Sequence, residues 1–182
     1  MHKITKLRIN EIKKQRYDEY IKRCSQINSE AEKFGRFRGS RHSLMIIENT
    51  YNYVKELFTD ILNVERNALK GHILFLDQDT YFDDLISSLR TFLLAEYKNS
   101  LDQEFLSTSS AYEAGRYQNP LKDLSIQKKI EEYSDRIHRL AVDTINSMRE
   151  EFKQDRNKSV LKTVPKIFGT IIKYIAKMII GL

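Results

Sequence analysis

The residues whose types and spacing most suggest chemistry lie in positions 156–182, which we call the basic tail. Lysines alternate there with groups of large aliphatic side chains, and no Asp or Glu follows Asp155. Amines of this kind attract a polyanion, while the aliphatic groups can be buried in an apolar phase. The number of cations in the basic tail, six, equals the formal net charge of +6 of the whole chain. These cations are Arg156, Lys158, Lys162, Lys166, Lys173 and Lys177.

The spacing within the basic tail is that of an amphipathic helix. At roughly 100° per residue, its large apolar side chains fall within one broad arc and its lysines fall on the opposite side, except that Ile180 lies among the lysines. Pro165 predicts that the helix begins near Val164 or that a kink separates 159–164 from the rest. The predicted membrane-binding residues are Lys162, Lys166, Ile167, Phe168, Ile171, Ile172, Lys173, Ile175, Lys177 and Ile179.

This helix is too polar to cross a bilayer. Its longest stretch without a charge, Ile167 to Ile172, has six residues, against the roughly 20 that a spanning helix needs. A helix with lysines on one face and isoleucines on the other can instead lie at an anionic membrane surface, where each well-placed cation contributes about 1 kcal/mol. From about Ser159 onward the composition resembles that of cationic amphipathic membrane-active peptides.

A purely structural role is the main alternative for the same helix. Its apolar face could pack on the rest of the chain or on another subunit, and a packed helix could also be released onto a bilayer after a trigger. Three features favour the membrane: the absence of acidic residues, the density of isoleucine, and a polar, hinge-like linker at 154–159, QDRNKS.

A second candidate site is the stretch RNALKGH, in which Asn67 follows Arg66 directly and His72 comes six positions after Arg66. This stretch resembles the Arg-Asn-(four)-His pattern of HEPN-type ribonucleases, which are small helical bundles that often act as dimers. The resemblance covers seven residues. It implies an RNA phosphate site shared by two subunits, with His72 transferring a proton and Arg66 stabilising charge. A capping arginine and an exposed histidine are the structural alternative.

Other chemistry finds little support in the sequence. Asp77, Asp79, Asp83 and Asp84 lie close together, but the stretch lacks the glycine and the terminal glutamate of an EF-hand loop, so charge at a helix start explains it better. No phosphate-binding loop, dinucleotide fingerprint, nucleophile elbow or zinc-protease motif is present. We therefore expect no metal, no cofactor and no catalytic residue outside the ribonuclease alternative. The single cysteine, Cys24, excludes an intramolecular disulfide.

The elements that would position these residues are predicted to be helices. With 6 Gly and 2 Pro in 182 residues, the composition favours an all-α fold. Apolar residues at helical spacing predict long helices over about 4–34, 44–69, 80–93 and 125–153. Gly35 fits a helix end, Ser40 or Ser43 a cap, and Thr80 with Asp83 a capping box. Residues 107–120 read as a loop. We predict a bundle of about four long helices followed by a C-terminal cationic amphipathic helix.

Charge divides the chain into three parts, which we take as its organisation. Residues 1–41 carry 12 basic and 5 acidic residues and predict a basic helix with a hinge loop, whereas 42–155 carry 13 basic and 20 acidic residues and predict the bundle core. Residues 156–182 are the basic tail. The basic N-terminal part could fold back on the acidic middle or face a polyanion such as nucleic acid, but it lacks a motif for sequence-specific readout.

These observations favour a nonenzymatic protein that binds or perturbs an anionic membrane surface through its tail, with the bundle serving regulation, self-association or partner binding. The first residues, MHKITKLRINEIKK, lack the apolar stretch of a secretory signal, so we expect a cytoplasmic protein that is peripherally associated with a membrane. Homo-oligomers fit the predicted helices, and nucleic-acid binding is not favoured. A composition rich in Ile, Lys, Asn and Tyr is typical of an A·T-rich microbial, phage or plasmid genome.

Overall fold

The fold is described by a computed structural model that covers residues 3–35, 39–69, 78–106 and 120–180. Within these ranges, side chains are described for residues 8–35, 39–69, 79–105 and 121–157. The helices are α1 (Lys3–Lys33), α2 (Ser40–Leu69), α3 (Gln78–Leu106) and α5 (Leu124–Ile180), with the 3-10 turn η1 (Pro120–Lys122) just before α5. The described residues contain no strand, so the expected all-α class is confirmed.

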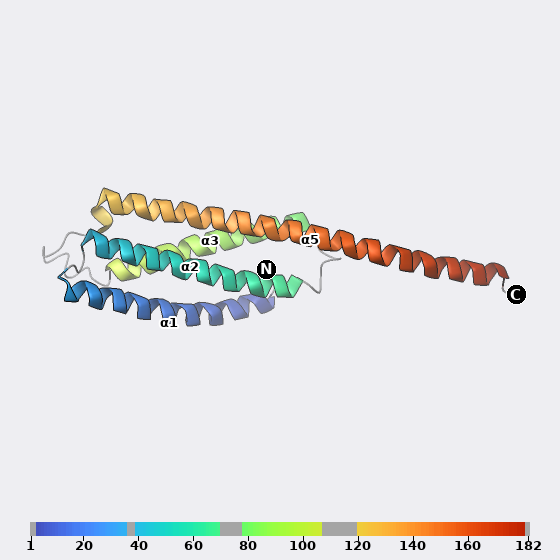
Figure 1. Ribbon diagram of the computed structural model, residues 1–182, viewed down its shortest axis with the longest axis horizontal. Helices are drawn as coiled ribbons and strands as arrows, with labels where there is room; N and C mark the ends of the chain where they lie inside the picture. Colours follow the sequence, from blue (N-terminus) through green and yellow to red (C-terminus); the bar gives the residue numbers. More distant parts are fainter. Residues whose placement is uncertain (1–2, 36–38, 70–77, 107–119, 181–182) are drawn as a thin grey trace.

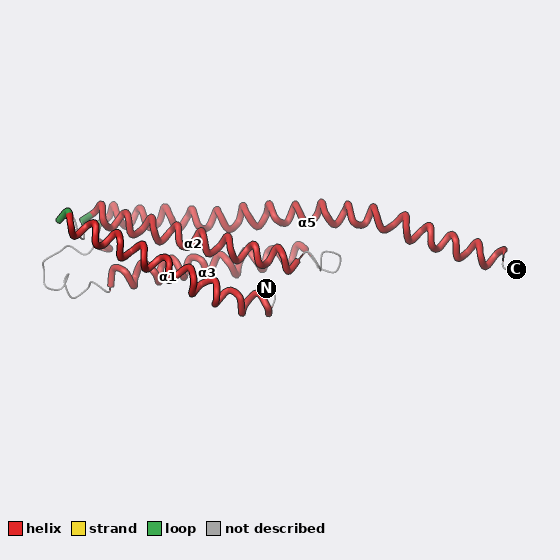
Figure 2. The backbone as a smooth tube through the Cα atoms, turned by 60° about the horizontal axis from the view of Figure 1, so that its bottom comes forward, coloured by secondary structure: helices red, strands yellow, loops and turns green. Residues whose placement is uncertain are grey.

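The four α-helices form an up-down-up-down bundle (Figure 1). Helix α1 packs on α2, and α5 packs on both α3 and α2. Each helix buries one apolar stripe against its neighbours, which suits this topology. One end of the bundle holds the α1–α2 turn, η1 and the start of α5, and we call it the turn end; α5 leaves the bundle at the other end, which we call the exit end (Figures 1 and 2).

Each helix contributes to the core through the stripe that its sequence predicts. Helix α2 buries Ile47, Val54, Phe58 and Ile61, each at most 1% exposed, although Leu44 of the predicted stripe is 39% exposed. The other helices add residues at helical spacing on one face of each: Tyr20 and Cys24 of α1, Phe82, Leu85, Leu89 and Leu93 of α3, and Ile126, Ile137, Ile145, Met148 and Phe152 of α5.

The helix ends agree with the sequence at one position and differ at two. Gly35 has φ 61°, the left-handed conformation that a helix C-terminus uses, as predicted. The carbonyl of Gly39 accepts the first backbone hydrogen bond of α2, from Ser43 at 3.0 Å, so Gly39 rather than Ser40 or Ser43 occupies the cap position. Helix α3 begins at Gln78, which places Thr80 inside the first turn instead of before it.

The largest difference from the sequence prediction concerns the last helix. The prediction ended a helix near Lys153 and placed a hinge at 154–159, whereas α5 runs as one helix of 57 residues from Leu124 to Ile180. A helix of that length spans about 85 Å. It passes through Pro165, which cannot donate a hydrogen bond to the carbonyl of Leu161. Residues 154–157 are all exposed, so their polarity reflects exposure of the helix and not a break in it.

Beyond the exit end, α5 continues alone as a rod in both views of the backbone (Figures 1 and 2). The predicted boundary between 155 and 156 therefore falls inside a helix. Phe152 is its last buried residue among those whose side chains are described. The basic tail thus begins about where contact with the bundle ends.

Candidate functional site

Ion pairs fasten α5 to the exit end of the bundle just before the basic tail. Lys153 lies 3.2 Å from Asp79 of α3, and Arg149 pairs with Asp83 one turn further along α3. From α2, Arg66 reaches Glu151 at 3.2 Å. Exposed pairs of this kind each contribute about 0–1 kcal/mol, so their main effect is to fix the position of α5.

An aromatic contact lies beneath these ion pairs. The rings of Phe82 and Phe152 are 6.0 Å apart between centroids, and the Arg149 guanidinium lies 5.8 Å from the centre of the Phe82 ring. Phe82 is 2% exposed and Phe152 is 7% exposed. Burial of two phenyl rings stabilises this junction far more than the exposed charges do. The basic tail therefore directly follows a part of α5 that is packed on the bundle.

The residues predicted to bind a membrane all belong to the helical part of the tail. Their backbone continues α5 without interruption up to Ile180, while their side chains lie outside the described set. None of the helices, over the residues that the structure describes, has the length and hydropathy needed to cross a membrane. The members of this set are Lys162, Lys166, Ile167, Phe168, Ile171, Ile172, Lys173, Ile175, Lys177 and Ile179.

Arg66, one half of the ribonuclease-like pair, lies in the last turn of α2 and is engaged with Glu151. Its Nε is buried and has no hydrogen-bond partner among the described residues. His72, the other half, lies outside the described residues. This contact joins the end of α2 to α5, and the pairing of Arg66 with His72 stays a prediction.

Two of the aspartates near the start of α3 are paired with cations of α5. Asp79 and Asp83 pair with Lys153 and Arg149, as described above, and Asp77 lies outside the described residues. In the ranges that the structure describes, no group of three His, Cys, Asp or Glu is arranged to hold a metal ion. Asp79 lies in the first turn of α3, where a carboxylate interacts favourably with the helix dipole.

Cations of the N-terminal part fold back on the acidic middle. Arg16 of α1 lies 2.7 Å from Asp60 and 3.3 Å from Glu56 of α2, and Arg23 lies 3.0 Å from Glu56. The hydrogen bond to Asp60 is the main reason that the pKa of Arg16 is raised. Of the two roles left open for the basic N-terminal part, the intramolecular one is thus observed for these arginines.

The interior between α1, α2 and α3 contains polar groups that the apolar stripes did not reveal. Glu96 of α3 is 6% exposed, its carboxylate lies 2.5 Å from Lys13 Nζ of α1, and it accepts a hydrogen bond of 2.8 Å from the hydroxyl of Tyr53. Glu65 of α2 is fully buried and accepts a hydrogen bond from Tyr81 at 3.2 Å. The Lys13–Glu96 pair favours one alignment of α1 with α3, because a buried carboxylate is costly without its cation.

Tyrosines surround these buried polar groups. The ring of Tyr20 stacks on Tyr53 with 4.9 Å between centroids, and its hydroxyl lies 3.1 Å from Thr50 Oγ1. Burial raises the pKa of both hydroxyls, so they stay neutral near pH 7. Cys24, hydrogen-bonded by Asn49 at 3.2 Å, has its pKa raised to about 12 by burial. These groups are closed off from substrate and satisfied within the bundle, so they hold α1 in place.

No protein-family model, no curated protein and no solved structure matches this chain. The fold and the candidate site define it as an all-α bundle protein whose last helix continues into a basic, aliphatic extension. Its function has to be argued from that extension and from the bundle surface.

Proposed function

We propose that this protein is a nonenzymatic helical-bundle protein that binds an anionic membrane surface through its basic tail. The observation that supports this proposal most is the course of α5, which remains a helix up to Ile180 while leaving the other helices behind at the exit end (Figures 1 and 2). A helix docked by its apolar face on its own bundle would instead run alongside it.

The helical phase of α5 supports a separate partner for the tail. Counting roughly 100° per residue from Phe152, which faces the bundle, Ile171 falls about 100° round the helix and Lys173 about 60° round it in the opposite sense. The aliphatic stripe of the tail is therefore displaced by roughly a third of a turn from the stripe that packs on α2 and α3. A simple continuation of bundle packing would keep the two stripes in line.

The charges of the tail favour an anionic partner over a second tail. The four lysines from Lys162 onward have no acidic residue within six positions in the sequence, so two parallel tails would repel each other. On an anionic bilayer the six cations of the basic tail together contribute up to about 6 kcal/mol. Burial of the isoleucine face adds to this, since each fully buried Ile side chain contributes about 1.5–3 kcal/mol and partial burial proportionally less. In this proposal the tail binds the membrane, and the bundle serves self-association or partner binding.

Vesicle sedimentation tests the proposal. The full chain should pellet with vesicles of equimolar phosphatidylcholine and phosphatidylglycerol, and a chain ending at Asn157 should stay in the supernatant. A variant with Lys166→Glu, Lys173→Glu and Lys177→Glu should bind at least about tenfold more weakly, with the largest difference at low salt. Equal pelleting of the full and shortened chains would overturn the proposal.

A matched control separates the position of the charges from their number. Lys14, Lys22 and Lys33 are exposed on α1, and reversing these three to Glu changes the net charge by the same amount as the tail variant. Because α1 belongs to the bundle, this control should retain most of the vesicle binding. Equal losses in both variants would mean that only net charge matters and would contradict a role for the tail.

A further inference from the structure

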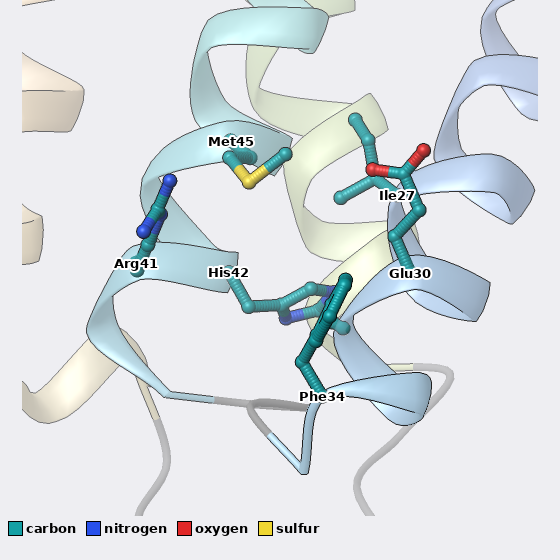
Figure 3. Close-up of a pocket in the computed structure, with 7 residues that line it drawn as sticks. Ile27, Glu30, Phe34, Arg41, His42 and Met45 are labelled. Atoms are coloured by element: carbon teal, nitrogen blue, oxygen red, sulfur yellow. The ribbon is translucent and has the colours of Figure 1, made fainter.

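The turn end of the bundle has a hollow between the last turns of α1 and the first turns of α2 (Figure 3). Its volume is about 130 Å³. The apolar lining consists of Ile27, Ala31, Phe34 and Met45, and Glu30, Arg41 and His42 complete the wall. The His42 ring lies 2.7 Å from Asn28 Oδ1 through its Nε2, which fixes one side of the hollow.

The same end of the bundle carries most of the exposed large apolar side chains. Among the described residues these are Ile21, Phe34, Leu44 and Leu124, and all but Ile21 belong to the turn end. Phe34 is 70% exposed and stands at the rim of the hollow (Figure 3). Of these four, only Phe34 lines the hollow, and a large apolar side chain exposed beside an apolar hollow is typical of an interaction site.

The size of the hollow matches one aromatic ring. An apolar cavity of about 150 Å³ is enough to bind benzene, and the hollow has about 130 Å³. This is below the roughly 300 Å³ at which pockets for larger organic ligands begin. A single side chain of a protein partner, such as a phenylalanine, fits better than a cofactor.

Two exposed side chains of opposite charge lie at the rim of the hollow. Glu30 of α1 and Arg41 of α2 lie on opposite sides of the hollow, and both are exposed (Figure 3). In a dimer with twofold symmetry, a residue on one side of the axis meets the residue on the other side of the second copy. Glu30 of one copy would then face Arg41 of the other, twice per dimer.

We propose that this hollow is the contact of a symmetric homodimer, in which Phe34 of each copy enters the hollow of the other and Glu30 pairs with Arg41 across the axis. This proposal concerns the turn end and is independent of what the tail binds. Because the hollow lies at the turn end, such a dimer leaves the exit end of each bundle, where the basic tail begins, outside the contact. Two tails on one assembly would strengthen surface binding through avidity.

Analytical ultracentrifugation of the full chain tests this dimer. The unmodified chain should dimerise, and Phe34→Ser should weaken dimerisation about tenfold or more, because a buried aromatic anchor is lost. Ile21→Ser, on the same helix but away from the hollow, is the control and should leave the dimerisation constant unchanged. A monomer at all concentrations, or a dimer that Phe34→Ser leaves intact, would overturn the proposal.

Charge reversal tests the pairing itself. Glu30→Arg and Arg41→Glu, each alone, place like charges opposite each other in a homodimer, so each variant should dimerise more weakly. An equimolar mixture of the two should form a heterodimer as stable as the original dimer, because both pairs are then restored. A mixture that dimerises no better than the separate variants would rule out this geometry.

Discussion

Lys153 Nζ of α5 lies 3.2 Å from Asp79 Oδ1 in the first turn of α3, at the point where α5 leaves the bundle. The hydrogen bond to Asp79 is the main cause of the raised pKa of Lys153. Arg149, one turn before Lys153 on α5, pairs with Asp83 of α3 in the same way. The cations that give the chain its net charge begin directly afterwards, at Arg156.

The contact between Phe82 and Phe152 should contribute much more to the free energy of unfolding than the basic tail does. Phe152→Ala removes a buried ring packed on Phe82 and should lower the free energy of unfolding by about 3–5 kcal/mol. Ending the chain at Asn157 should change it by less than about 0.5 kcal/mol, because that part of α5 lies past the other helices. Urea unfolding followed by circular dichroism measures both. A loss of several kcal/mol on truncation would show that the tail packs on the bundle.

The Lys13–Glu96 pair should contribute to the attachment of α1. Lys13→Ala leaves the buried Glu96 carboxylate with the Tyr53 hydroxyl but without its cation, and should cost about 1–3 kcal/mol. Lys14→Ala, at an exposed neighbouring position, is the control and should cost less than about 0.5 kcal/mol. Changing both partners to Met should recover much of the loss, because no charge is then buried alone. Similar effects of both lysine substitutions would refute this role.

Glu104 should make the bundle less stable as the pH rises. Burial raises the pKa of this carboxyl above its usual value. Between the unfolded and the folded pKa the native state binds more protons, so stability falls as pH increases through that window. Glu104→Gln should therefore stabilise the protein at pH 8, and the gain should shrink as the pH falls through that window and be lost below about 4.3, the usual Glu value. Thermal unfolding across pH, with the exposed Glu11→Gln as control, checks the sign; a gain that grows towards low pH would contradict it.

The ribonuclease alternative predicts that Arg66 and His72 cleave RNA, whereas the proposed function is nonenzymatic. Because Arg66 is engaged with Glu151, we expect no RNA cleavage by the purified chain above background. A labelled single-stranded RNA resolved on a denaturing gel is the assay. Cleavage that disappears in His72→Ala and in Arg66→Ala, with both variants still folded, would establish the alternative and refute the nonenzymatic proposal.

Periodicity in the sequence predicted the helices and most of the core. Ile47, Val54, Phe58 and Ile61 recur at steps of seven, four and three, and all four are buried, because in a bundle the face with the most apolar area is the one that packs. Leu44 is 39% exposed although Ser43 and Ile47 in the same turns are buried, because at roughly 100° per residue it lies about 60° round the helix from Ile47, at the edge of the stripe.

Two features could not be predicted from the sequence. Glu65 and Glu96 look like surface residues of their helices, and their burial depends on tyrosines and a lysine brought in by other helices. The polar run at 154–159 looked like a hinge, but polar side chains are equally suited to an exposed helix, so a pattern of polarity alone cannot separate the two. For the tail, spacing predicts a surface but does not identify its partner.

Depth measurements along the tail test the central claim most directly. Cys24 is buried and its pKa is raised to about 12, so it should resist labelling under conditions that modify an exposed thiol. An environment-sensitive fluorophore can then be attached at Ile167→Cys, Ile171→Cys or Ile175→Cys on the aliphatic face, and at Lys166→Cys, Lys173→Cys or Lys177→Cys on the other. On equimolar phosphatidylcholine and phosphatidylglycerol vesicles, we expect blue-shifted emission at the three isoleucine positions and little shift at the three lysine positions. No shift at any position, or equal shifts on both faces, would contradict the proposal that the tail lies on a membrane by its isoleucine face.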